Sequence, residues 1–158
     1  MHIREKTPAD SERLTAIWTE HFGAPRVVSR GREHRPLVLP GFVAEEGGAL
    51  LGAVTFQRTG DELEIVTLDS QSEDHGVGTA LLATAVSEAH ARGITRLWLV
   101  TTNDNMRALR FYQRRGWSIC ALHVNAVDEA RKLKPEIPLI GEHEIPIRHE
   151  IEFEFRLT

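Results

Sequence analysis

The sequence contains little of what stabilises small secreted proteins or crosses membranes. Its 158 residues include one cysteine, Cys120, so no disulfide can form within the chain and we expect a reducing compartment. No apolar run approaches the ~18 residues of a membrane span. Charged residues at positions 4–6 follow Met1 where a secretory leader would be apolar. These absences predict a soluble, cytoplasmic protein that has no membrane partner.

A strong excess of charge of one sign is also absent. The formal net charge is −4, which gives no reason to expect a nucleic-acid partner. Hydrophobic residues make up 41% of the chain, enough for one well-buried core, while the length is too short for two ordinary domains. We therefore predict a single domain over residues 1–158.

The hydrophobic periodicity predicts strands and helices in a mixed order. Extended patterns occupy residues 2–5, 42–44, 50–57, 62–68, 96–101, 117–124 and 149–157. Helical spacing occupies residues 8–22, 77–92 and 105–115, with a short polar helix at 128–134. Residues 25–40 show no clear period, which predicts an irregular connection. The order indicates an α/β fold with a mixed sheet, helices on both faces, and a parallel strand–helix–strand crossover over residues 62–101.

A glycine-rich turn, Gly76-Val77-Gly78, lies between an extended segment and a helix. Such a turn leaves backbone N–H groups uncovered in front of the positive end of a helix dipole, which suits a phosphate. A P-loop would need lysine and serine or threonine at fixed places that are not filled here, and a dinucleotide fingerprint would need glycine where Leu81 stands. By spacing alone, the turn is either a plain tight turn or another kind of anion site.

Two motifs together resemble the GNAT superfamily of N-acetyltransferases. The pyrophosphate loop of that family has the form Gln/Arg-x-x-Gly-x-Gly/Ala; Gly76 and Gly78 match it, whereas Glu73 replaces the Gln or Arg. One strand further along the chain, a second helix in the family reads Asn-x-x-Ala-x-x-Phe-Tyr-x-x-x-Gly-Phe/Trp, which residues 105–117 match. The resemblance covers roughly residues 42–124 and implies a GNAT fold, whose central, mostly antiparallel sheet has six to seven strands.

The resemblance also implies acetyl-CoA as the acyl donor, no metal, and direct attack of a primary amine on the thioester in a ternary complex. Tyr112 matches the tyrosine that protonates, or hydrogen-bonds, the leaving sulfur, and Glu64 stands in the register of a glutamate that accepts the amine proton through water. A solvated strand carboxylate is the equal alternative for Glu64. The implied cofactor contacts are the main chain of Leu68, Asp69 and Ser70, the turn residues His75, Gly76, Val77, Gly78 and Thr79, and Asn105, Ala108 and Tyr112 on the next helix.

The acceptor side is less well defined. In GNAT proteins the segment after the first helix shapes the acceptor pocket, so the predicted substrate residues are Ser29, Arg30, Arg32 and His34. Their charge suits a carboxylate or phosphate on a small-molecule amine. A non-catalytic acyl-CoA sensor, which Glu73 favours, and acetylation of a protein or peptide amine stay open. The proline-containing segment before the last strand allows a homodimer contact.

Overall fold

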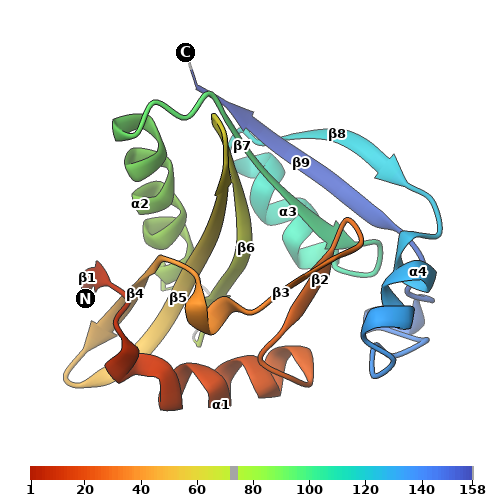
Figure 1. Ribbon diagram of the computed structural model, residues 1–158, viewed down its shortest axis with the longest axis horizontal. Coiled ribbons are helices and arrows are strands. Elements are labelled where there is room, and N and C mark those ends of the chain that lie inside the picture. The colour runs from red at the N-terminus through yellow and green to blue at the C-terminus, as the bar shows by residue number, and fades with distance from the viewer. Residues whose placement is uncertain (72–74, 158) are drawn as a thin grey trace. The chain divides into compact units, whose positions relative to one another are not determined.

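The computed structural model describes residues 1–71 and 75–157 (Figure 1). Within these residues the helices are α1 Ser11–Phe22, α2 Val77–Ala91, α3 Met106–Arg114 and α4 Ala126–Leu133. The strands are β1 His2–Glu5, β2 Val27–Ser29, β3 Arg32–His34, β4 Gly41–Glu46, β5 Ala49–Thr59, β6 Glu62–Ser70, β7 Arg96–Thr102, β8 Ser118–His123 and β9 Glu150–Arg156. Short 3-10 turns occupy Pro8–Asp10, Pro36–Val38 and Glu142–Glu144.

Seven of these strands form one sheet in the order β1-β4-β5-β6-β7-β9-β8, and β2 pairs with β3 separately. The predicted α/β class with a mostly antiparallel sheet is therefore confirmed. The chain forms two compact units: residues 1–27, 35–97 and 157 in the first, and residues 28–34 and 98–156 in the second. The chain enters the second unit twice, at residue 28 and again within β7 after residue 97. The single domain predicted for residues 1–158 stays a prediction.

The first unit contains both antiparallel pairs and a parallel one. β1 pairs antiparallel with β4, β4 with β5, and β5 with β6. The start of β7 lies beside the start of β6, since Thr95 N–H donates to the Asp61 carbonyl at 2.8 Å and Arg96 pairs with Glu62 at 3.1 Å. Strands that start side by side run parallel, so the predicted crossover through α2 is confirmed.

Helices cover both faces of the sheet in this unit (Figure 1). Leu14 and Trp18 of α1 form a buried cluster with Ala53 of β5. On α2, Val77 lies against the neighbouring position of β5, Gly52. Adjacent strand residues point to opposite faces, so α1 covers one face and α2 the other.

Residues 25–40 are more regular than predicted. β2 and β3 form a hairpin whose turn is Arg30-Gly31, with φ angles of 49° and 74°. Two consecutive positive φ values are typical of the type I′ turn, which matches the twist of a hairpin. The prediction of an irregular connection was wrong because arginine replaces the asparagine or aspartate that usually indicates this turn.

The second unit contains the C-terminal strands and an aromatic core. β8 pairs antiparallel with β9, and the end of β7 lies beside the start of β9 because Asn103 N–H donates to the His149 carbonyl at 3.1 Å. Tyr112, Trp117 and Phe153 are buried together. No helix among the described residues is long and apolar enough to cross a membrane. The cytoplasmic location stays a prediction.

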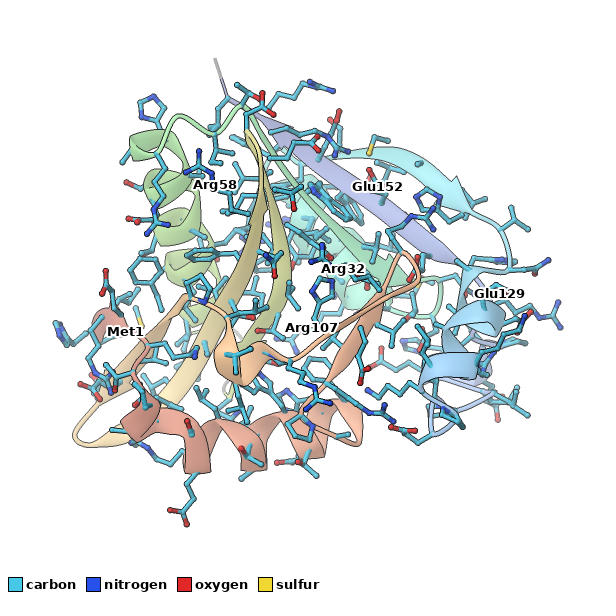
Figure 2. All side chains as sticks on the ribbon, in the orientation of Figure 1. Met1, Arg32, Arg58, Arg107, Glu129 and Glu152 are labelled. Atoms are coloured by element: carbon cyan, nitrogen blue, oxygen red, sulfur yellow. The ribbon has the colours of Figure 1, made fainter. Side chains whose placement is uncertain are left out.

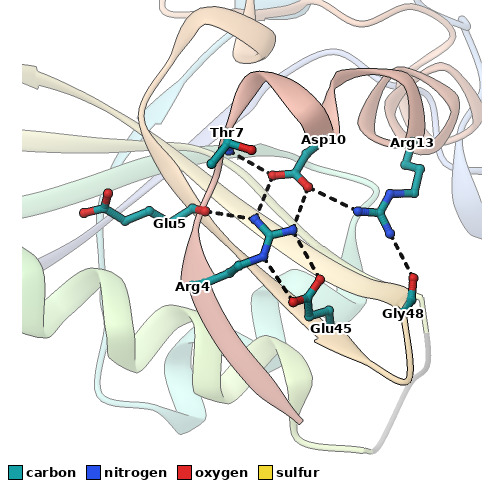
Figure 3. Close-up of polar contacts among 7 residues, drawn as sticks. All are labelled: Arg4, Glu5, Thr7, Asp10, Arg13, Glu45 and Gly48. Atoms are coloured by element: carbon teal, nitrogen blue, oxygen red, sulfur yellow. Dashed lines mark hydrogen bonds and ion pairs between the residues drawn. The ribbon is translucent and has the colours of Figure 1, made fainter.

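A partly buried ion network ties the N-terminal strand to the start of α1 (Figure 3). The Arg4 guanidinium donates to both oxygens of Asp10, at 2.8 and 3.0 Å, and to Glu45 at 3.1 Å. The Asp10 carboxylate, which is fully buried, also accepts from the Thr7 N–H at 2.9 Å and from Arg13 at 3.2 Å. The hydrogen bonds from Arg4 hold the pKa of Asp10 well below its ordinary value.

This network predicts acid-dependent stability. We expect Asp10→Asn to lower the free energy of unfolding at pH 7 by about 2–4 kcal/mol, because Arg4 loses a buried partner. The folded-state pKa of Asp10 is depressed, so its contribution is complete above the unfolded-state pKa of ~4 and is lost as pH falls further. Urea unfolding from pH 7 to pH 3 should therefore show the difference from wild type shrinking. Glu46→Gln, at an exposed carboxylate on the neighbouring strand, is the control; a difference that does not change with pH would contradict the assignment.

Candidate active site

The glycine turn comes directly after β6, and its second half opens α2. Glu73, which departs from the family motif, belongs to residues 72–74 and lies outside the described residues. Gly76 is the N-cap of α2 with a φ of 73°, in the left-handed region that favours glycine. A Cβ at Gly76 would touch nothing within 4 Å. Backbone conformation, and not space, therefore calls for glycine here.

The first turn of α2 has the features of an anion site. Its leading N–H groups have no acceptor within the helix by geometry, and the turn contains no acidic residue. Val77 is buried and anchors the turn, Gly78 is half-buried, and His75 and Thr79 are exposed. These predicted cofactor residues lie together at one helix N-terminus, where the dipole favours negative charge.

Gly52, which was not predicted from the sequence, lets β5, β6 and α2 approach closely beside the turn. A Cβ on Gly52 would collide with the Asp69 main-chain oxygen and would lie 3.0 Å from the Val77 side chain. Gly52 also pairs with Ser70, at the end of β6. A glycine inside an apolar strand pattern often marks such a close approach, and that signal was available in the sequence.

The face of β6 that points toward α1 carries buried polar side chains. Asp69 pairs with Ala53, which packs against α1, so Asp69 shares this face. Thr67 pairs with Thr55 on the same face, and their hydroxyl oxygens are 2.7 Å apart. Asp69 and Thr67 are only 4% and 2% exposed. Polar groups buried inside a sheet cost free energy unless they are bonded, so this row is unusual for a purely structural strand.

A β-bulge separates Glu64 from this row. Thr55 pairs with Thr67 and the next residue of β5 pairs with Ile65, so Val66 is an extra residue. Glu64 then pairs with Gln57, two positions after Thr55, and therefore lies on the α1-facing side. Glu64 is 5% exposed, so it is not the solvated strand carboxylate that the sequence left open. A bulge of this kind re-aims side chains and is common next to active sites.

Asp69 is held by two side chains of α1. Trp18 donates its indole N–H to one carboxylate oxygen at 2.6 Å, and His21 Nδ1 lies 3.0 Å from the other. The Asp69 side chain is 3% exposed, while that of His21 is 33% exposed. Neither Trp18 nor His21 was predicted as a site residue, because a contact across about 50 positions of sequence leaves no local pattern.

In the second unit, Asn105 begins α3. Its side-chain oxygen accepts from the Ala108 N–H at 3.0 Å, so it caps the helix. No described residue accepts a hydrogen bond from the amide nitrogen of Asn105, which leaves that donor for a ligand. Ala108 is half-buried.

Tyr112 is 8% exposed and packs among aromatic rings. The ring centroids of Trp117, Phe153 and Phe111 lie 5.7, 5.6 and 5.1 Å from its own. Phe111, the preceding residue, is only half-buried and has the Arg115 guanidinium 3.7 Å above its ring. Of Phe111 and Tyr112, the buried side chain is therefore Tyr112, the predicted catalytic residue.

The predicted substrate residues of the hairpin differ in their surroundings. Ser29 and His34 are buried, and the Ser29 Oγ atom lies 3.4 Å from His34 Nε2. The main-chain N–H and the guanidinium of Arg30 both donate to the buried carboxylate of Glu150, at 3.2 and 3.3 Å. Arg32, on β3 (Figure 2), is exposed and makes no ion pair within the described part of the chain. Of the predicted cations here, Arg32 is the one whose charge is not already balanced.

Comparisons with known proteins agree with this arrangement. Residues 7–117 match the acetyltransferase (GNAT) family. The Bacillus subtilis (strain 168) protein YxbD is 39% identical over 152 residues, covering 96% of each chain. YdhI from the same organism is 43% identical over 141 residues, covering 89% of this chain and 88% of YdhI.

Solved structures are similar over nearly the whole chain. An IAA acetyltransferase from Bacillus cereus ATCC 14579 has a TM-score of 0.76 at 21% identity, covering 99% of both chains. A GNAT family acetyltransferase from Elizabethkingia anophelis with acetyl-CoA bound has a TM-score of 0.74 at 16% identity, covering 99% of this chain and 97% of its own. A ribosomal-protein-alanine N-acetyltransferase from Brucella melitensis has a TM-score of 0.71 at 17% identity, covering 99% and 100%.

The fold, the glycine turn and these matches define an acyltransferase. The chain belongs to the acetyltransferase (GNAT) family.

Proposed function

We propose that this acetyltransferase moves the acetyl group of acetyl-CoA to a primary amine of a small molecule, by direct attack in a ternary complex. The observation that carries the proposal is the buried ionisable face of β6, with Glu64 and Asp69, on the strand that leads into the turn at Gly76. Such a strand offers main-chain groups to a thioester donor and side chains that can take a proton from an amine.

The donor would be held mainly by backbone groups. The main chain of Leu68, Asp69 and Ser70 pairs with the pantetheine arm, and the N–H groups of residues 76–79 bind the pyrophosphate. His75 adds a side chain that is positive when protonated. The amide of Asn105 donates to the arm, and the small side chain of Ala108 leaves room for it. The acetyl-CoA bound in the Elizabethkingia anophelis structure supports this choice of donor.

The chemistry assigns three roles. The N–H near Leu68 donates to the oxygen that becomes negative when the amine adds to the carbonyl. The Tyr112 hydroxyl gives its proton to the departing sulfur, because sulfur leaves more readily as a neutral thiol than as a thiolate. Glu64 takes the amine proton through water, and its burial beside the bulge gives it a fixed position. No metal enters this scheme.

The acceptor proposal rests on the charge of the β2–β3 hairpin. Since Glu150 balances Arg30, the exposed Arg32 is the group available to a carboxylate or phosphate on the acceptor. The buried Ser29 and His34 would support the hairpin from inside. The homodimer contact suggested by the final segment stays a prediction.

Calorimetry with acetyl-CoA and an assay of free thiol release test this function. We expect saturable binding of acetyl-CoA, and thiol release above background with small primary amines that carry a carboxylate or phosphate. The panel includes neutral small amines and peptides with a free N-terminus or lysine. Binding without release for every amine would favour the sensor function, and release with peptides alone would favour a peptide acetyltransferase. Absence of acetyl-CoA binding would overturn the proposal.

A further inference from the structure

A carboxylate of β9 holds the turn of the β2–β3 hairpin. Glu150 accepts the main-chain N–H of Arg30 at both carboxylate oxygens, at 3.2 and 3.3 Å. We propose that Glu150 is a positioning residue, which aims Arg32 at the anionic group of the acceptor and so helps to decide which amines are acetylated. This inference rests on the proposed function and deepens it at the same site. Glu150, Arg30 and Arg32 all belong to the second compact unit.

The backbone of the turn needs support from outside the hairpin. Arg30 has a φ of 49°, in the left-handed region that glycine, asparagine and aspartate adopt most readily. The short side chains of asparagine and aspartate bond to the neighbouring backbone, whereas the long side chain of arginine provides no such local bond. Glu150 provides the support instead, because it binds the main-chain N–H and, at 3.3 Å, the guanidinium of the same residue. The contacts with Glu150 therefore give a reason for arginine at this position.

The same pair fixes where the turn lies. Glu150 is 3% exposed, and a buried carboxylate costs free energy unless a cation and hydrogen bonds balance it. Within the described part of the chain, Arg30 is the cation that pairs with Glu150. Moving the turn away from β9 would leave the charge of Glu150 buried and unbalanced. We therefore expect the hairpin to keep its turn at the start of β9.

Arg32 follows this turn closely. β2 ends at Ser29 and β3 begins at Arg32, so two residues form the loop, and Ser29 faces Arg32 across the strand pair. The Cα atoms of Arg30 and Arg32 are at most about 7 Å apart. No described carboxylate pairs with Arg32, so the hairpin backbone sets the point from which its guanidinium reaches a ligand. A guanidinium binds a carboxylate or phosphate through two parallel hydrogen bonds, and a shift of the turn would spoil their geometry.

The response to different acceptors separates positioning from a merely structural role. If Glu150 served stability alone, its loss would affect all acceptors alike. If Glu150 aims Arg32, its loss should affect acceptors with an anionic group, and only while Arg32 is present. The preference for an anionic amine over a neutral analogue is therefore the quantity to measure.

Thiol release is measured with the anionic amine selected by the panel and with a neutral analogue that lacks the acid group. We expect Glu150→Gln to raise KM for the anionic amine about tenfold, to keep kcat within about threefold, and to change KM for the neutral amine less than about twofold. The glutamine places an N–H₂ group where one carboxylate oxygen accepts from Arg30, so the turn loses a bond and its ion pair. Arg32→Gln should lower the preference at least as much, and adding Glu150→Gln to it should lower the preference no further.

Two further variants and one measurement without turnover complete the test. Glu150→Asp keeps the buried charge on a shorter side chain, so we expect the turn to shift and KM for the anionic amine to rise about threefold. The control, Glu154→Gln, changes a glutamate on the same face of β9 but further along the strand, and should leave the preference unchanged. Hydrogen exchange of the Arg30 amide reports its bond to Glu150, and we expect exchange about tenfold faster or more in Glu150→Gln.

Several results would overturn the inference while leaving acetyl transfer intact. These are an equal rise of KM for both amines, or no change of either, in Glu150→Gln, and Arg30 amide exchange at the same rate as in wild type. A wild type without preference for anionic amines, or an Arg32→Gln protein with the wild-type preference, would also overturn it. If wild type binds acetyl-CoA but releases thiol with no amine, the proposed function fails and the inference fails with it.

Discussion

Tyr112→Phe is expected to lower kcat for thiol release about 100-fold or more and to leave Kd for acetyl-CoA nearly unchanged. The substitution removes the proton donor for the thiolate, and general acid catalysis is typically worth about 100-fold to 10,000-fold. Phenylalanine keeps the ring, which packs against Trp117 and Phe153 at 5.7 and 5.6 Å. The free energy of unfolding should therefore fall by only about 1 kcal/mol, the usual loss for one hydroxyl.

The neighbouring Phe111 provides the control for Tyr112. Phe111→Leu removes a half-buried ring in edge contact with Tyr112, without touching the hydroxyl. We expect Phe111→Leu to cost stability and to keep kcat within about threefold of wild type. Steady-state kinetics, calorimetry and urea unfolding on both variants separate the two effects. If Tyr112→Phe turned over at the wild-type rate, the hydroxyl would have no role as the acid.

Gly52→Val is expected to lower the free energy of unfolding by about 3 kcal/mol, at the upper end of the usual cost of overpacking. The new Cβ would collide with the Asp69 main-chain oxygen, which cannot move aside as a flexible side chain could. The structure would have to separate β5 from β6 or displace the first turn of α2. Either movement disturbs residues 68–70 and the turn at Gly76, so we also expect acetyl-CoA binding to weaken tenfold or more.

A second valine substitution on β5 tests whether this effect is local. Ala49→Val places the same side chain at an exposed position at the start of the strand, where we expect a change within about 0.5 kcal/mol. Urea unfolding and calorimetry with acetyl-CoA are the measurements. If the Gly52→Val protein were as stable as the Ala49→Val protein, the sheet would relax around the new side chain, and the close approach at Gly52 would not contribute to stability.

Most elements of the fold could be predicted because their signals are local. The apolar face of α1 recurs at helical spacing, Gly23 ends it in the left-handed conformation, and β6 alternates in the strand manner. The hairpin at Arg30-Gly31 could not be predicted. Its backbone has the φ angles of a usual hairpin turn, but arginine is not a residue that usually indicates such a turn. The motif around Gly76 and residues 105–117 pointed to the family, which the matches then showed.

The surroundings of the site residues depend on strand register. The burial of Glu64 follows from a bulge at Val66, and a shift of one residue would have sent its side chain to the other face. The role of Glu64, like those of Tyr112 and Arg32, stays a proposal. Arg30, predicted as a free cation for the acceptor, is paired with Glu150, 120 residues later in the chain.

Outside residues 25–40, the sequence by itself determined the order of helices and strands, the glycine turn before α2 and the family, because periodicity and turn chemistry are properties of neighbouring residues. Only the tertiary structure decided that Asp69 meets Trp18 and His21, 51 and 48 positions away. It also identified the Asp69 main-chain oxygen as the atom that a side chain at Gly52 would collide with. These features arise where α1 and α2 pack on opposite faces of β5 and β6. The spacing of residues within one segment does not indicate such contacts between distant segments.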